Sequence, residues 1–472
     1  FNGRTAGGYL KAYSYSAVIT AGPFALMTGM VLAIQVMFIF FGISLEESHL
    51  YTASVIYPFV FSHILSSGFV MVITRYLADL LYSNDQRSVT PSLFGIMVFT
   101  EIIGSIAAIL FFWNKPLDFG VKFLTYIFFM QMLAIWLSGV YLTAIKNYKG
   151  LFRSYISGVV ISIVLSFFVL YTGCLAPVPG VLLAMDIGLG CIVMLFLMHI
   201  VRYFGYAEDG LNFAFLPYFE KHPKLFFIAL FYTMALYLPN IIIWQGPMGI
   251  SIADTYVYAP VYDVVTFYAF LSILPVMMMF VVSTELHFYE KYAVYFTYIT
   301  KKGNFKDIED AKQDVLHTLW VELRNIVEFQ LVFTLIFLAL GNYFLSQIGL
   351  SPEAVNIYIL IVLGAFFLGA VQVIYTLLLY FEDQQGVLWI VGSLFMAVLV
   401  FGIIGFLMGE KTYGFTFFLA TAFAFLAAYA RAVYFCNRID YFVFCSRPVF
   451  YHEPEGWFSK LANLLQKHAV KE

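Results

Sequence analysis

Long apolar segments alternate with short polar ones along nearly the whole chain. Each apolar segment has at least the ~20 residues needed to cross a bilayer core. A membrane-spanning segment of this kind is helical, because the lipid offers no partner for its backbone N–H and C=O groups. The pattern therefore predicts an all-α polytopic membrane protein with twelve transmembrane helices. The expected spans are Tyr9–Phe41, Leu50–Thr74, Val89–Trp113, Val121–Ile145, Leu151–Gly173, Gly180–Phe204, Lys224–Gly246, Tyr256–Thr284, Ile326–Ser346, Ala354–Phe381, Gly386–Met408 and Tyr413–Cys436.

The spans divide into two sets of six around the polar segment 205–223. Pro23 interrupts the first span, where it predicts a bent helix lining a cavity, and Pro239 interrupts the seventh span. Matching interruptions in two halves are typical of duplicated transporter folds with a site at the interface of the repeats. The alternative is that two prolines align by chance. We predict two pseudo-symmetric six-helix lobes around a central cavity, formed by 1–204 and 224–436 and joined by a cytoplasmic linker, 205–223.

Two further segments have the spacing of amphipathic helices. In 304–325, apolar residues that include Leu316, Trp320 and Leu323 share one face, and charged residues share the other. In the C-terminal tail, 437–472, a similar apolar stripe begins at Trp457. Both read as interfacial helices on the cytoplasmic side. They either pack at the membrane surface among lipids or dock a cytoplasmic partner, and the sequence leaves both interpretations open.

Composition and charge define the class and the orientation. Of the 472 residues, 62% are hydrophobic and 11% are charged, and the mean hydropathy is +0.88, which excludes a soluble domain. All but three of the 25 Lys and Arg residues lie in the termini and the even-numbered loops or at the span ends that adjoin them. The exceptions are Lys115, Lys122 and Lys411. The positive-inside rule therefore predicts that both termini are cytoplasmic, and we expect a multi-pass protein of the plasma membrane.

Motifs for catalysis and metal binding are not visible in the sequence. It contains no P-loop, no HExxH and no clustered Cys and His residues. We expect no enzymatic activity, no cofactor, no metal site and no nucleic-acid partner.

Ionisable groups inside spans are costly and are therefore functional candidates. Glu101 lies near the centre of the third span and His63 near the centre of the second, and the two could exchange a proton. Alternatively, they are a structural pair that holds helices together. Arg75 and Asp79 have the spacing of an intrahelical ion pair, which either latches a gate or sets topology.

The eighth span combines one acid with aromatic residues. Asp263 lies close to Tyr258 and Tyr262, and such a wall suits a carbohydrate path because sugar C–H faces pack on aromatic rings. Structural packing is the alternative for each tyrosine. The other candidates for a substrate path are Tyr13, Ser16, Thr20, Pro23, Gln35 and Asn240.

Three motifs carry a resemblance to a known family. They are Lys11-Ala-Tyr-Ser-Tyr, Ile19-Thr-Ala-Gly-Pro-Phe24 and Thr74-Arg-Tyr-Leu-Ala-Asp79. The chain resembles the Pel exopolysaccharide transporter (PelG) family of the multidrug/oligosaccharidyl-lipid/polysaccharide (MOP) flippase superfamily. The resemblance implies a two-lobed inner-membrane protein that exports an amino-sugar polymer for a biofilm matrix. It also implies two partners, a cytoplasmic glycosyltransferase and a cyclic-di-GMP-binding membrane subunit.

Two alternatives to polymer export stay open. One is a flippase of the same superfamily for a lipid-linked oligosaccharide or a small molecule. The other is a membrane scaffold that anchors a glycosyltransferase and transports nothing. Costly polar groups inside spans favour transport, because a passive anchor does not need them.

Overall fold

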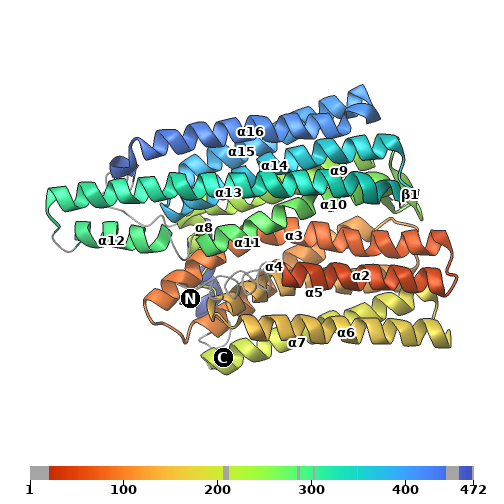
Figure 1. The fold of residues 1–472 in the computed structure, drawn as a ribbon. Coiled ribbons are helices and arrows are strands. Elements are labelled where there is room, and N and C mark those ends of the chain that lie inside the picture. Colours follow the sequence, from red (N-terminus) through yellow and green to blue (C-terminus); the bar gives the residue numbers. More distant parts are fainter. Residues whose placement is uncertain are drawn as a thin grey trace. The chain divides into compact units, whose positions relative to one another are not determined.

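The computed structural model describes residues 21–205, 212–283, 288–300, 303–347, 349–442 and 456–469, and these are almost entirely helical (Figure 1). Within them, twelve helical segments are long and apolar enough to cross a membrane, which confirms the predicted number. The first half contains α2 (Gly22–Phe40), α3 (Leu45–Tyr82), α4 (Val89–Phe112), α5 (Phe119–Ala144), α6 (Tyr148–Thr172), α7 (Pro177–Phe204), α8 (Pro217–Lys221) and α9 (Pro223–Trp244). The second half contains β1 (Ile250–Ile252), β2 (Tyr256–Tyr258), α10 (Pro260–Phe270), α11 (Leu274–Ser283), α12 (Tyr289–Thr300), α13 (Phe305–Gln347), α14 (Pro352–Tyr380), α15 (Gln384–Met408), α16 (Tyr413–Cys436) and α17 (Trp457–Ala469).

Polar residues between the spans fix where several helices begin. The Ser44 hydroxyl accepts a hydrogen bond from the Glu47 N–H at the start of α3. The side chains of Asp118, Asn147 and Ser351 cap α5, α6 and α14 in the same way. Each cap satisfies a backbone donor that the helix itself leaves without an acceptor. Local sequence therefore sets these helix ends.

Contacts between residues divide the chain into two compact units. The N-terminal unit holds Pro23–Tyr237, Ile250–Tyr258 and α17, and the C-terminal unit holds Leu238–Gly249 and α10 to α16. The division falls inside α9, directly before Leu238-Pro239, whereas the sequence places the linker at 205–223. The predicted pseudo-symmetry of six-helix lobes stays a prediction.

Close helix packing defines the N-terminal unit. Helices α6 and α7 run side by side (Figure 1), and α7 also packs against α5. Gly158 on α6 faces Gly188 on α7 so closely that a Cβ at Gly158 would lie 2.5 Å from the Gly188 carbonyl oxygen. Small residues permit such an approach of two backbones inside a membrane.

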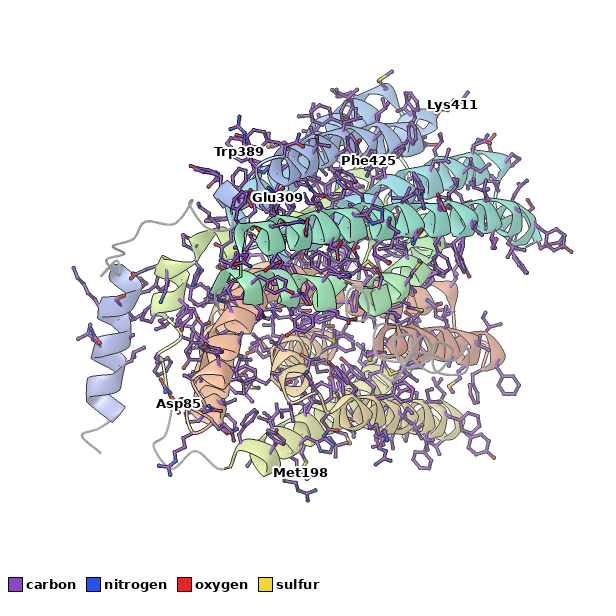
Figure 2. The ribbon with its side chains drawn as sticks, turned by 60° about the vertical axis from the view of Figure 1, so that its left-hand side comes forward. Asp85, Met198, Glu309, Trp389, Lys411 and Phe425 are labelled. Carbon is purple, nitrogen blue, oxygen red and sulfur yellow. The ribbon has the colours of Figure 1, made fainter. Side chains whose placement is uncertain are left out.

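In the C-terminal unit, α14 is the central helix and packs against α10, α13, α15 and α16. Its buried residues occupy most of its circumference, including Ile361, Ala365 and Leu368. In Figure 2, Trp389 marks the start of α15 and Lys411 lies just beyond its last residue, Met408, as expected for a helix that crosses the membrane. This unit is therefore a bundle of membrane-spanning helices packed around α14.

Two predicted segment boundaries in the second half are wrong. The expected interfacial helix 304–325 is not separate, because α13 continues without a break from Phe305 to Gln347. No proline lies in this range, and Gly341 near its end is the first glycine, so nothing in the local sequence ends the helix.

The eighth span does not begin at Tyr256. That residue belongs to β2, which pairs with β1 in an antiparallel hairpin. The turn between the strands holds Ala253 and Asp254 at positive φ, which matches the twist of a tight hairpin. The span begins at Pro260 and is interrupted by a short 3-10 turn, Leu271–Ile273.

Candidate functional site

Asp263 is the centre of a hydrogen-bonded cluster in the C-terminal unit. Its carboxylate accepts hydrogen bonds from the Asn240 side-chain amide at 2.6 Å and from the Trp244 indole N–H at 3.0 Å. The backbone N–H of Ala259 donates a third bond at 3.2 Å. Asp263 lies in the first turn of α10, where the helix dipole also favours a negative charge. The structure thus joins two predicted site residues, Asn240 and Asp263.

Trp244 was missed in the sequence, although an indole N–H buried in a membrane span needs an acceptor. The signal was available, because Trp244 follows Asn240 by four residues and so lies on the same helix face. The cluster joins the end of α9 to the start of α10. It therefore fixes the two helix ends that flank the hairpin.

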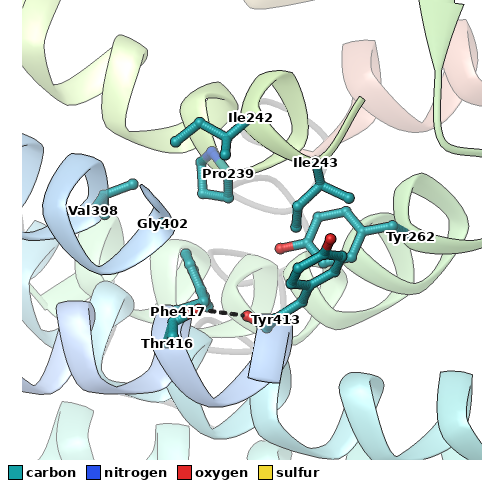
Figure 3. A pocket seen from close by; sticks show the side chains of 9 residues that line it. All are labelled: Pro239, Ile242, Ile243, Tyr262, Val398, Gly402, Tyr413, Thr416 and Phe417. Atoms are coloured by element: carbon teal, nitrogen blue, oxygen red, sulfur yellow. Dashed lines mark hydrogen bonds between the residues drawn. The ribbon is translucent and has the colours of Figure 1, made fainter. Parts of the chain in front are cut away.

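A small cavity lies beside this cluster (Figure 3). The rings of Tyr262 and Tyr413 pack edge to face on one side of it, with centroids 6.3 Å apart. Pro239 lines another side. Its volume of about 10 Å³ is close to the minimum that holds one water molecule. A sugar ring does not fit there. Tyr262 therefore packs the interior of this unit, and Tyr258, which lies in β2, belongs to the other unit.

The N-terminal unit contains a larger cavity of about 260 Å³. Its walls are mostly aromatic and come from α3, α4 and α5; the lining residues are Tyr57, Pro58, Phe61, Ala107, Ala108, Phe111, Phe112, Thr125 and Phe129. The volume is slightly below the ~300 Å³ at which ligand pockets usually begin. The arrangement offers apolar ring faces with few polar groups.

The hairpin packs beside this cavity. The Tyr57 hydroxyl donates to the Val257 carbonyl oxygen at 2.8 Å and accepts from the Val257 N–H at 2.9 Å. The Tyr256 ring contacts Tyr57, with centroids 4.9 Å apart, and also contacts Phe111 and Phe112. His49 and Tyr258 form a further hydrogen bond. The hairpin is therefore held on α3 and covers aromatic residues that line the cavity.

His63 bonds a tyrosine in the structure, and its predicted proton exchange with Glu101 stays a prediction. The His63 ring nitrogen shares a hydrogen bond with the Tyr237 hydroxyl at 2.9 Å, and the ring stacks on Trp136. Glu101 is half-buried on α4 and has no described hydrogen bond. Both residues stay candidates for gating or coupling, but within the described residues His63 bonds Tyr237 and not Glu101.

The other predicted residues that the structure describes lie on α2 and α3. The Arg75 guanidinium and the Asp79 carboxylate form the expected ion pair at 3.4 Å on a half-exposed surface, where such a pair contributes little. Gln35 donates to the Thr52 hydroxyl at 3.2 Å. Pro23 lies in the first turn of α2, a position that tolerates proline. Tyr13, Ser16 and Thr20 lie outside the described residues, as does the N-terminal half of the span in which Pro23 predicts a bend.

The docking candidates on α13 differ in their exposure. Leu323 is buried, Leu316 is half-buried and Trp320 is 36% exposed. The buried part of the stripe packs on the chain's own helices, α12 and α14. Among the three candidates, Trp320 and Leu316 keep part of their surface exposed, although the Trp320 ring also contacts Tyr429 of α16, with centroids 6.2 Å apart.

The second docking candidate, Trp457, lies on α17, which docks on α8. The Glu220 carboxylate accepts hydrogen bonds from the backbone N–H groups of Gly456 and Phe458 and from the Ser459 hydroxyl, at 2.9, 2.5 and 2.6 Å. Partial desolvation would raise the pKa of Glu220, but the hydrogen bonds from Ser459, Gly456 and Phe458 outweigh it and lower the pKa. Trp457 itself is 68% exposed. Sequence analysis missed Glu220, because its contact joins residues more than 230 positions apart.

Metal binding has no support in the part of the chain that the structure describes. No three His, Cys, Asp or Glu side chains come together there.

Solved structures show the class of this fold. The outward-facing conformation of a multidrug resistance MATE family transporter of the MOP superfamily is similar over 92% of this chain and 96% of its own, with a TM-score of 0.57 and 11% identity. The MATE transporter ClbM, solved in complex with Rb⁺, covers 99% of both chains at a TM-score of 0.58 and 12% identity. The Vibrio cholerae MATE transporter VcmN in the bent form is similar over 92% of this chain and 98% of its own, with a TM-score of 0.57 and 12% identity. The fold is therefore that of MOP-superfamily membrane transporters.

The family follows from the sequence as a whole. Residues 1–444 match the PelG family, described as "Putative exopolysaccharide Exporter (EPS-E)". The chain belongs to this family, which confirms the resemblance carried by the three motifs, and it is a multi-pass membrane protein of the transporter class. No curated protein sequence matches the chain.

Proposed function

We propose that the chain exports an amino-sugar exopolysaccharide outward across the bacterial inner membrane, with both termini in the cytoplasm. The observation that carries the proposal is the match to an exopolysaccharide exporter family over residues 1–444 in a chain with a transporter fold. Ion coupling or polymer synthesis would drive the movement. The exported polymer would contribute to a biofilm matrix.

The aromatic cavity of the N-terminal unit supports a carbohydrate substrate. Its walls present Tyr57, Phe111 and Phe129, whose ring faces suit the C–H faces of a sugar ring. The hydroxyl of Thr125, which also lines it, is buried and lies near the hydroxyl of Tyr256. We assign this cavity to the substrate path.

The experiment is complementation of a strain that lacks its own exporter, with secreted and cell-associated polymer measured separately. Phe111→Ala removes one cavity wall and should reduce secretion severalfold at normal protein levels. The matched control is Phe119→Ala, because Phe119 is 79% exposed and does not line the cavity. Equal secretion by both variants would contradict the assignment of the path.

The same strain separates the alternative functions. A flippase for lipid-linked oligosaccharides would leave lipid-bound sugars in the inner leaflet when it is deleted, whereas a polymer exporter would leave free polymer in the cell. A scaffold would tolerate Phe111→Ala, because it uses no internal path. Accumulation of lipid-linked sugar alone would therefore overturn polymer export.

A cytoplasmic glycosyltransferase and a cyclic-di-GMP-binding membrane subunit are the proposed partners. The support is the edge of α13, where Trp320 and Leu316 keep part of their apolar surface exposed beside charged residues, even though Trp320 also contacts Tyr429. Co-purification of the glycosyltransferase with the wild-type chain, and its loss from a Trp320→Glu/Leu316→Glu variant, would test this docking.

A further inference from the structure

Helix α7 carries one carboxylate deep in its apolar segment, Asp186, which is not among the sequence candidates. It lies nine residues after Pro177, the first residue of α7, which corresponds to about 14 Å along the axis. The residue is only 5% exposed. Neither carboxylate oxygen has a hydrogen-bond partner among the described residues. Aspartate is rarely buried in this way without a partner.

Uncharged polar groups from the neighbouring helices lie at the same level. Gln131 of α5 donates its amide N–H to the backbone carbonyl oxygen of Asp186 at 3.0 Å, and its own side-chain oxygen has no described donor. Ser162 of α6 lies against Gly188, half a turn further along α7. The hydroxyls of Ser162 and of Ser166, one turn away on α6, are buried and have no described partner. This level of the unit is polar but supplies no charge.

No described cation compensates Asp186. The titratable neighbour on α3, Tyr51, donates its hydroxyl to the Met185 sulfur at 3.4 Å and not to the carboxylate. His63, also on α3, bonds Tyr237. The charged residues of the other helices that pack on α7 are Lys122 in the first turn of α5, Lys149 and Arg153 in the first turns of α6, and half-buried Glu101 on α4. None of them has a described ion pair with Asp186.

An ionised carboxylate in this setting would be very costly, and such a group takes up a proton instead. The enclosed state therefore favours the neutral acid, and a state in which water reaches α7 favours the carboxylate. A ligand drives a conformational transition only if it binds the two states with different affinities. Asp186 would bind a proton more tightly in the enclosed state than in the hydrated state, so a proton could drive the transition.

We propose that Asp186 is a proton-binding site of the N-terminal unit, loaded while α5, α6 and α7 enclose it and emptied when water enters between them. The proposal rests on the proposed export function and names the cation that would couple to it. A carboxylate retained only for packing would be expected to bond a neighbouring helix, and this one bonds none of those described.

The first test is Asp186→Asn, which keeps the shape of the side chain and removes its ability to release a proton. At normal membrane levels, polymer secretion should fall at least tenfold, and the remainder should not respond to a protonophore. Asp118→Asn is the matched control, because Asp118 is an exposed cap of α5 and asparagine caps equally well. Secretion by Asp186→Asn at the wild-type level and with the wild-type protonophore response would overturn the proposal.

A second measurement uses the wild-type protein and needs no polymer. A hydrophobic carbodiimide reacts with protonated carboxylic acids in apolar surroundings, and mass spectrometry locates the product. We expect modification of Asp186 that decreases as the pH rises. No modification of Asp186 at any pH would overturn the proposal, and so would modification that sodium suppresses but pH does not change.

The two failures are distinguishable. If the wild-type chain secretes no polymer while Asp186 still shows pH-dependent modification, polymer export fails and the proton site stands. If Asp186→Asn does not accumulate in the membrane, the carbodiimide result decides.

Discussion

The hydrogen bonds of Glu220 should control whether α17 stays docked. Glu220→Gln keeps the size of the side chain but removes the negative charge at the first turn of α17. A side chain at this position is worth about 0.5–2 kcal/mol at a helix start, and a charge there adds about 0.3–1 kcal/mol. Because Glu220 is only half-buried, we take about 1 kcal/mol for the loss of docking free energy, which corresponds to about a fivefold change in the docking equilibrium.

An isolated helix of this length is marginal in water, so the loss of docking should also unfold α17. Hydrogen–deuterium exchange of residues 457–469 should become about fivefold faster in Glu220→Gln at neutral pH. Glu46→Gln is the control, because Glu46 is an exposed acid in the first turn of α3. Exchange that is unchanged in Glu220→Gln, or raised equally in both variants, would refute the reasoning.

The pH dependence follows from the lowered pKa of docked Glu220. Docking contributes fully above the ordinary glutamate pKa of about 4.3 and weakens as the pH falls through the lower pKa of the docked state. After correction for the intrinsic exchange rate, wild-type α17 should therefore lose protection on acidification. Glu220→Gln should show no such step, and a step of equal size in that variant would assign the effect to another group.

Three further predictions concern packing and docking. Tyr57→Phe removes both hydrogen bonds to Val257 and should weaken the docking free energy of the hairpin by about 1–2 kcal/mol. Deuterium exchange in 250–258 should therefore become faster, and unchanged exchange would show that ring contacts alone hold the hairpin. Gly158→Ala should lower the free energy of unfolding of the N-terminal unit by about 1–3 kcal/mol, because the new Cβ meets the backbone of α7. Gly392→Ala, with open space around it, should be neutral or stabilising, and equal effects in thermal unfolding would refute the close packing. Trp320→Glu with Leu316→Glu should leave the fold intact and reduce recovery of the glycosyltransferase in pull-downs, and normal recovery with normal secretion would exclude docking at α13.

Several interactions were predictable because they depend on neighbours in the chain. The Arg75–Asp79 ion pair follows from helical spacing, and the formation of spans follows from the absence of water to satisfy the backbone. Asp186 also carried a readable signal, since a single acid inside an apolar segment is a functional candidate by default. What the sequence did not reveal is that this acid is enclosed with no hydrogen-bond partner among the described residues, while Asp263 accepts three hydrogen-bond donors.

The sequence by itself determined the twelve spans, the membrane class and the family, because hydropathy and motifs are properties of short stretches. Only the tertiary structure decided which polar groups meet. Asp263 is bonded by Trp244, Glu220 holds the start of α17, and Tyr57 holds a hairpin 200 residues away. These contacts depend on which faces of distant helices pack together, and no local pattern specifies that. For the same reason, burial separated Leu323, which packs inside the chain, from Trp320, which stays open on the same stripe.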